Sequence, residues 1–176
     1  MQWRNTPGRY GIIGQALHWV VVLGIIANYF IAEAAEDEEA GGLMGLHRSV
    51  GITILALAAL RLLWRLVDRA PPWPADMAAH ERVIARTVHA VFYVLLFALP
   101  VTGWMISSAE GDPVRWFGLV ELPGLSVGAS EDTLEGLHEV LFNVLFALAV
   151  LHALAALKHH FWDRDRVLRS MLPGRG

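Results

Sequence analysis

The sequence predicts an all-α integral membrane protein, built as a bundle of four transmembrane helices. Of its 176 residues 55% are hydrophobic and only 18% are charged, and the mean hydropathy is +0.45, which is more apolar than a soluble domain. Four apolar stretches are each long enough to cross a hydrocarbon core of about 30 Å. Only turns, loops and tails lie between them, so residues 1–176 are expected to form a single domain.

The four predicted helices cover about residues 12–32, 43–63, 83–106 and 136–157. The first contains Gln15, His18 and Asn28 and is followed by an acidic run without a cleavage pattern, so we expect a retained span and not a signal peptide. The second and third are separated by a Pro-Pro-Trp-Pro segment at 71–74, which cannot continue a helix. A longer loop, 107–135, contains glycine and proline and precedes the fourth.

Basic residues flank alternate ends of these helices, and this asymmetry predicts the orientation of the chain. Twelve of the fourteen lie at one set of ends: Arg4, Arg9, Arg61, Arg65, Arg69, Arg82, Arg86, Lys158, Arg164, Arg166, Arg169 and Arg175. Only Arg48 and Arg115 lie at the other. Both termini are therefore predicted to be cytoplasmic, and loops 33–42 and 107–135 periplasmic, in a multi-pass protein of the bacterial inner membrane.

Several classes of function are excluded by what the sequence lacks. It has no cysteine, which rules out disulfides, iron–sulfur clusters, thiolate haem ligation and covalent attachment of c-type haem. No dinucleotide-binding, phosphate-binding or serine-hydrolase motif stands in a suitable strand-to-helix context. The expected surroundings are a lipid bilayer, and no nucleic-acid partner is predicted.

Histidines within the predicted helices are the strongest indication of function. His138 and His152 lie fourteen residues apart, so on one helix they point in nearly the same direction, about 21 Å apart along the axis. His18 matches His152 in depth near the cytoplasmic ends, and His47 matches His138 near the periplasmic ends. Facing histidines in a four-helix bundle can bind one iron from both sides. Since an intramembrane histidine is costly unless partnered or used, two bis-histidine b-type haems are predicted.

Other interpretations of these histidines stay open. A single intramembrane histidine can simply form a hydrogen bond to a neighbouring helix. A structural zinc site needs four ligands at one ion, whereas these histidines are spread over two depths, which disfavours zinc. His89 also lies near the cytoplasmic depth, and spacing alone does not decide whether His18 or His89 is the partner of His152.

Short motifs are distributed along nearly the whole chain. The first half contains Leu17-His18-Trp19, Leu46-His47-Arg48-Ser49-Val50-Gly51-Ile52 and Arg61-Leu62-Leu63-Trp64-Arg65-Leu66. The second half contains His89-Ala90-Val91-Phe92-Tyr93, Ala98-Leu99-Pro100-Val101-Thr102-Gly103, Leu137-His138-Glu139, Leu151-His152-Ala153 and Lys158-His159-His160-Phe161-Trp162. As a set they resemble the bacterial cytochrome b561 family, which is related in architecture to the di-haem cytochrome b subunits of membrane formate dehydrogenases and nickel–iron hydrogenases.

The resemblance implies two haem b groups, one held by His47 and His138 and the other by His18 and His152. It also implies electron transfer between a periplasmic one-electron donor and membrane ubiquinone. The most specific activity that the resemblance implies is superoxide oxidation, in which superoxide gives up one electron and leaves as dioxygen while ubiquinone is reduced. The expected enzyme is then a superoxide:quinone oxidoreductase.

Three further residues are candidates for the surroundings of these groups. The resemblance favours His89 as a neighbour of a haem propionate or of the quinone, although an interhelical hydrogen bond explains it equally well. Arg48 follows a predicted ligand and is a candidate partner for the propionate of the periplasmic haem, or a charge that reaches the membrane surface. His159 follows His152 by seven residues and could contact a quinone and pass protons to it, or simply lie in a basic tail.

The charge of the predicted periplasmic surface helps to identify the electron donor. Twelve acidic residues face it, against Arg48 and Arg115, a formal balance of minus ten. Such a field repels a diffusing anion and suits a cationic protein donor, unless the two arginines make a local positive funnel. Three functions are therefore considered: a superoxide:quinone oxidoreductase, a haem subunit that receives electrons from a periplasmic redox protein or dehydrogenase, and a non-redox bundle with packing or metal-binding histidines.

Overall fold

The computed structural model describes residues 2–36, 42–125 and 128–173. Four long helices dominate it, as predicted: α1 (Ile12–Glu36), α2 (Gly42–Val67), α3 (Ala79–Ala109) and α4 (Glu131–Lys158). All four are long and apolar enough to cross a membrane. Each predicted span lies inside its helix, and the helices extend beyond the apolar stretches into polar residues at one or both ends.

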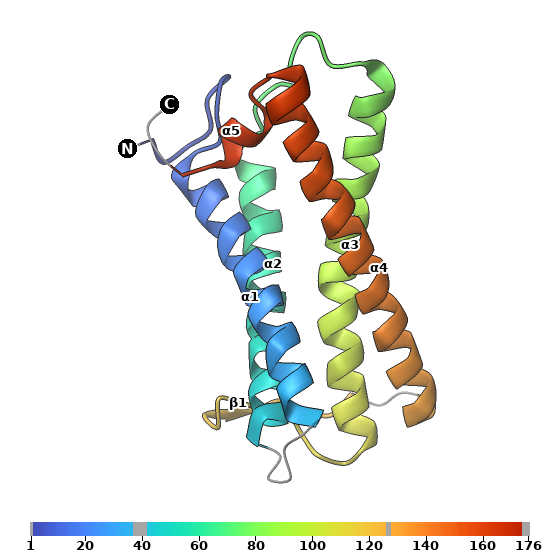
Figure 1. The fold of residues 1–176 in the computed structure, drawn as a ribbon. Helices are drawn as coiled ribbons and strands as arrows, with labels where there is room; N and C mark the ends of the chain where they lie inside the picture. The colour runs from blue at the N-terminus through green and yellow to red at the C-terminus, as the bar shows by residue number, and fades with distance from the viewer. Residues whose placement is uncertain (1, 37–41, 126–127, 174–176) are drawn as a thin grey trace.

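The helices are arranged as two pairs (Figure 1). α1 packs on α2, α2 on α3, and α3 on α4. A buried cluster of Val21, Ile54, Ala58 and Leu96 joins the first three helices. Within the described residues neither α1 nor α2 packs extensively against α4. The pair α1/α2 therefore stands opposite the pair α3/α4, and the two pairs are packed together through α2 and α3.

Both termini lie at one end of the bundle, which we call the terminal end (Figure 1). The short helix α5 (Val167–Met171) lies against the start of α1. There Gln15 Nε2 donates to the carbonyl oxygen of Ser170 at 3.0 Å, and Trp19 Nε1 donates to that of Met171 at 2.9 Å. This arrangement agrees with an even number of spans, while the assignment of this end to the cytoplasm stays a prediction.

The opposite end carries a small β-hairpin that the sequence did not reveal, and we call it the hairpin end. Strands β1 (Arg115–Trp116) and β2 (Val120–Glu121) pair antiparallel within the loop expected over 107–135. Phe117 and Gly118 between them have positive φ, which permits the tight reversal. The hairpin is fixed to α2, because Trp116 Nε1 donates to Thr53 Oγ1 at 3.1 Å and the Phe117 amide donates to Ser49 Oγ at 3.0 Å.

The last turn beyond α4 differs from a simple continuation of the helix. It widens into a π-helical turn, η1 (His159–Asp163), and Arg164 then takes a left-handed conformation that ends it. The chain turns back toward α1 from there. As a result His159 is buried, at 7% exposure, instead of lying along an exposed tail.

Candidate functional site

His47 from α2 and His138 from α4 face each other near the hairpin end, and we call them the hairpin-end pair. Their ring centroids are 6.4 Å apart and the ring planes are inclined by 74°. Imidazole nitrogens bind first-row metals at about 2 Å, so two rings on opposite sides of one metal have centroids about 6 Å apart. The separation in the hairpin-end pair fits a metal atom shared between the two rings.

Hydrogen bonds fix which nitrogen of each ring is free. His47 Nδ1 lies 3.2 Å from the carbonyl oxygen of Asn28, and a carbonyl can only accept, so Nδ1 carries the proton. His138 Nδ1 lies 2.9 Å from Thr102 Oγ1. The Thr102 hydroxyl donates its single proton to the carbonyl oxygen of Leu99 at 2.8 Å, so it accepts from His138. Both rings therefore keep an unprotonated Nε2, the state that a metal ligand requires.

Gly103 lets α3 approach His138 closely. A Cβ added at Gly103 would lie 3.2 Å from Cε1 of the His138 ring, closer than an ordinary contact. Thr102 and Gly103 occur in one of the motifs that carry the family resemblance, but sequence reasoning gave neither a role. Only the structure shows that Thr102 forms a hydrogen bond to the imidazole of His138 and that Gly103 lies against the same ring.

Three histidines come together near the terminal end, and we call His18, His89 and His152 the terminal-end cluster. His89 and His152 are in edge contact, with ring centroids 5.4 Å apart, and His89 also stacks on Trp73 at 6.4 Å. Phe92 contacts His152 at 5.4 Å. His18 packs on Trp19 at 5.2 Å and interacts electrostatically with both other histidines. The structure thus brings together all three residues that the sequence placed at this depth.

Geometry distinguishes the two possible partners of His152. His89 and His152 are closer than the roughly 6 Å of two rings on one metal, and their helices α3 and α4 pack directly on each other. His18 lies on α1, which does not pack extensively against α4 within the described residues. A flat macrocycle is more easily placed between α1 and α4. This favours His18, in line with the resemblance, and the assignment stays a prediction.

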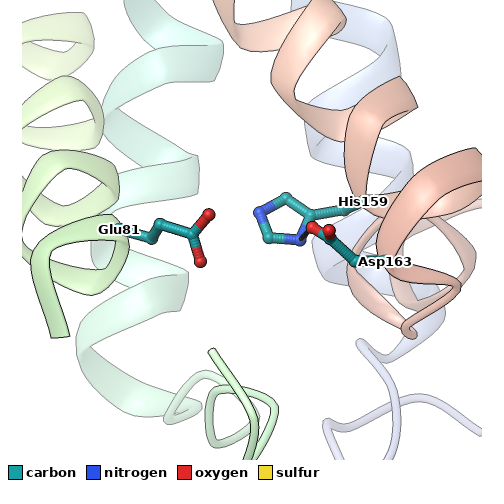
Figure 2. A group of neighbouring side chains, drawn as sticks. All are labelled: Glu81, His159 and Asp163. Carbon is teal, nitrogen blue, oxygen red and sulfur yellow. Dashed lines mark ion pairs between the residues drawn. The ribbon is translucent and has the colours of Figure 1, made fainter. Parts of the chain in front are cut away.

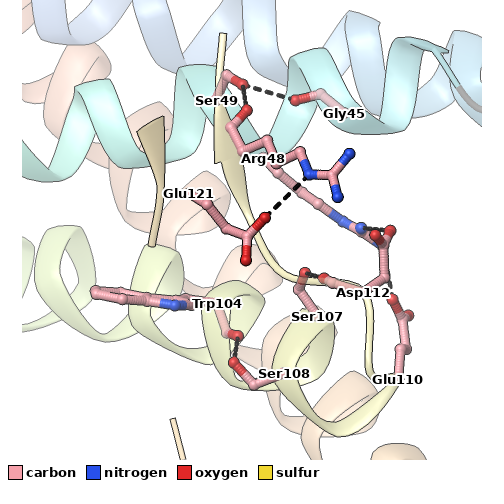
Figure 3. A network of polar contacts seen from close by, with 10 residues as sticks. Gly45, Arg48, Ser49, Trp104, Ser107, Ser108, Glu110, Asp112 and Glu121 are labelled. Atoms are coloured by element: carbon pink, nitrogen blue, oxygen red, sulfur yellow. Dashed lines mark hydrogen bonds and ion pairs between the residues drawn. The ribbon is translucent and has the colours of Figure 1, made fainter. Parts of the chain in front are cut away.

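Arg48 is held by carboxylates at the hairpin end (Figure 3). One guanidinium nitrogen lies 2.6 Å from Glu110 Oε2, and another contacts Asp112. Arg115 pairs with Glu121 at 3.2 Å. Both basic residues expected on the periplasmic side are therefore paired with acids. Of the acidic residues counted there, Asp37, Glu38 and Glu39 lie outside the described part of the chain.

His159 is the centre of a charged cluster at the terminal end, in which Glu81 and the His159 ring face each other (Figure 2). His159 Nδ1 lies 2.7 Å from Asp165 Oδ2 and 3.0 Å from Asp163 Oδ2. Lys158 Nζ bridges Glu81 at 2.7 Å and Asp163 at 2.8 Å. The donor atoms of Glu81, His159 and Asp163 converge within 4.8 Å, but the lysine ammonium already supplies a cation to both carboxylates. The cluster leaves His159 Nε2 without a carboxylate partner among the described ion pairs.

Comparison with known proteins identifies a family for the chain. A family model described as prokaryotic cytochrome b561 matches residues 9–174. Cytochrome b561 homolog 2 of Escherichia coli is 35% identical, over 98% of this chain and 95% of its own length. A probable superoxide oxidase, CybB, of Yersinia pestis is 32% identical, over 94% and 96% respectively. Cytochrome b562 of Cereibacter sphaeroides is 26% identical, over 96% and 97%.

These matches cover nearly the whole chain, and the family is one of membrane b-type cytochromes. They confirm the resemblance drawn from the motifs, and together with the four helices they place the chain in the bacterial inner membrane as a multi-pass protein. Membrane electron transfer with b-type haem follows from that membership. The chain belongs to the prokaryotic cytochrome b561 family.

Proposed function

We propose that the protein transfers electrons across the membrane with two haem b groups, from a periplasmic one-electron donor to ubiquinone. His47 and His138 would hold one haem, and His18 and His152 the other. When bound, each haem supplies a one-electron carrier whose potential the protein tunes. The hairpin-end pair carries the proposal, because its ring separation and its two fixed Nδ1 protons suit a shared iron.

The terminal end is proposed to be cytoplasmic. The positive-inside rule supports this orientation, since eleven of the thirteen basic residues that the structure describes belong to that end. The hairpin-end haem then lies toward the periplasm and receives electrons first. Electrons leave at the terminal end, where protons from the cytoplasm are available.

Ubiquinone is proposed to bind beside His159. Reduction to ubiquinol needs two electrons and two protons, so a titratable group is required at the binding site. Carboxylates hold Nδ1 of His159, which directs Nε2 away from them. Glu81 faces the ring from α3 (Figure 2). When both ring nitrogens are protonated, Nδ1 donates to the carboxylates, and Nε2 can donate a hydrogen bond to a quinone oxygen at the membrane edge and pass a proton to it.

Superoxide is the first candidate donor. One relative, 32% identical, is named as a probable superoxide oxidase. In that reaction two superoxide ions each give up one electron and leave as dioxygen, and one ubiquinone takes two electrons and two protons to become ubiquinol. The protein would then be a superoxide:quinone oxidoreductase.

A cationic periplasmic redox protein is the second candidate donor, and the pairing of Arg48 and Arg115 favours it. Neither arginine offers an unopposed positive charge to an anion, because Glu110, Asp112 and Glu121 hold them. Opposite potentials steer association, so an acidic face attracts a basic partner.

The first experiment is to purify the protein from membranes, record oxidised and dithionite-reduced spectra, and measure the haem-to-protein ratio. Two b haems per chain are expected. A folded chain that stays colourless when supplied with haem would contradict the proposal and favour a bundle without redox function.

The sign of the salt dependence then separates the two donors. Repulsion between superoxide and an acidic face is screened by salt, so ubiquinol formation from superoxide should accelerate as ionic strength rises. Reduction by a basic protein donor should slow down instead. The double variant Glu110→Gln/Asp112→Asn frees Arg48 and should speed the superoxide reaction more than Glu131→Gln/Asp132→Asn, which removes two acidic charges at the same end without freeing an arginine. Haem-loaded protein that does not react with superoxide would leave the protein donor as the function.

A further inference from the structure

Arg61 occupies the level of the terminal-end cluster on α2. It follows His47 by fourteen residues, the same spacing that separates His138 from His152 on α4. Arg61 therefore projects from nearly the same face of α2 as His47, about 21 Å closer to the terminal end. Its guanidinium interacts electrostatically with His18, His89 and His152. On α2 an arginine stands where α4 carries its second histidine.

Arg61 is half-buried there, and one of its donor nitrogens has no partner. Its Nη1 is shielded from solvent and has no hydrogen-bond partner, and the same is true of Nε1 of Trp64, three residues further along α2. Both side chains line one pocket together with Tyr93. Asp68 also lines it, but its Oδ2 accepts from the Asn5 amide at 2.9 Å. Two buried donors without acceptors are costly in a membrane protein, which indicates a missing anionic or carbonyl group.

We infer that Arg61 and Trp64 bind a propionate carboxylate of the haem held by His18 and His152. The inference rests on the proposed function, because it requires a haem at that level. A guanidinium matches a carboxylate through two parallel hydrogen bonds, and the indole N–H adds a third donor. Haem carries its carboxylates at one edge of the macrocycle, so a group beside the axial histidines is placed to bind them. A lipid phosphate offers similar chemistry and is distinguished by the test.

The test compares haem with haem dimethyl ester, in which both carboxylates are blocked. The parent, Arg61→Gln, Arg61→Lys and Trp64→Phe are each prepared without haem and titrated with either compound, in nanodiscs of zwitterionic lipid with and without phosphatidylglycerol. Affinity is read from the haem spectra, and midpoint potentials of both haems from redox titration. The hairpin-end haem serves as an internal reference. Arg86→Gln, an exposed arginine at the same end, is the matched control.

With haem, Arg61→Gln should weaken binding of the terminal-end haem about tenfold to a hundredfold, since hydrogen bonds to charged groups contribute about 1.5–3 kcal/mol. Its midpoint potential should fall, because a positive charge that stabilises the reduced state is lost. Arg61→Lys and Trp64→Phe should show smaller losses in the same direction. With the dimethyl ester, parent and Arg61→Gln should bind alike, and Arg86→Gln should match the parent throughout.

An equal loss with haem and with the ester would overturn the inference, because Arg61 would then act on something other than the propionate. No loss with either compound would overturn it as well. A potential that depends on phosphatidylglycerol in the parent but not in Arg61→Gln would assign the site to a lipid phosphate. The spectrum of the hairpin-end haem shows whether Arg61→Gln is folded. If it is not, the same comparison of haem with its dimethyl ester is made with Arg61→Lys. A parent without any haem would instead be a failure of the proposed function.

Discussion

The hairpin-end pair and the terminal-end cluster are organised differently, although both use histidines at matching depths. Acceptors on neighbouring helices hold His47 and His138, and each leaves Nε2 free. In the terminal-end cluster Nδ1 of His89 is buried without a partner, and the rings of His89 and His152 are packed among aromatic side chains. The first site is set by hydrogen bonds and the second by packing and by the charge of Arg61.

This difference has a physical consequence for cofactor binding. A ligand whose second nitrogen is already bonded does not have to choose a tautomer or a ring orientation when the metal arrives. A cluster held by aromatic contacts can rearrange, since such contacts do not fix the proton. We expect the hairpin-end site to be the more preorganised of the two and the terminal-end site to order further when haem binds.

The largest effect should come from removing one ligand at each level. His138→Ala is expected to lose the hairpin-end haem alone, and His152→Ala the terminal-end haem alone, because the two residues lie about 21 Å apart on one helix. The haem-to-protein ratio should fall from two to one in each variant. Reduced-minus-oxidised spectra should show that different haems remain, whereas loss of both haems from either variant would argue against independent sites.

Next in size is the choice between His18 and His89. His18→Ala should lose the terminal-end haem, because His18 is the predicted partner of His152 and His89, on the adjacent helix α3, does not replace it. His89→Ala should keep both haems with a shift in one midpoint potential, since His89 is expected to be a neighbour of the haem and not its ligand. The same haem ratio and redox titration measure both. The opposite result would make α3 the source of the ligand.

A smaller effect is expected at Thr102, which is not a predicted haem ligand but contacts one, His138. Thr102→Val keeps the shape but removes the acceptor for His138 Nδ1, and loss of such a partner typically weakens metal binding about 10–100-fold. Thr102→Ser restores the hydroxyl and should recover most of the affinity. Haem titration followed at the hairpin-end site measures this, and an unchanged affinity in Thr102→Val would show that the hydrogen bond does not matter.

The smallest effect should follow Gly103→Ala. The added Cβ would press on His138 Cε1 from 3.2 Å, so the ring must shift by a few tenths of an ångström. Haem affinity should fall by about fivefold or less, in line with about 1 kcal/mol of overpacking. Gly45→Ala is the matched control on α2, where an added Cβ meets nothing within 4 Å, and it should behave as the parent.

Features that depend on the residues of a single helix could be predicted from the sequence. Hydropathy gave the four spans, and the spacing of His138 and His152 on α4 placed them on one face. Sequence reasoning missed the acceptors of the imidazoles, because Thr102 reaches His138 across 36 residues of chain and no local pattern marks that contact. It also missed the hairpin and the π-helical turn. Both depend on tertiary contacts, the hairpin on Ser49 and Thr53 of α2 and the turn on carboxylates around His159.

The hydrogen bonds between the two ends of the chain also set an order of assembly. Gln15 and Trp19 belong to α1, and their acceptors Ser170 and Met171 lie about 150 residues later, after the other three long helices. This contact can close only after the residues up to Met171 have been synthesised. His18 lies between the two donors, so its level of the bundle stays accessible longest. Truncation before Ser170 should therefore trap a newly made protein with the hairpin end assembled and the terminal end open.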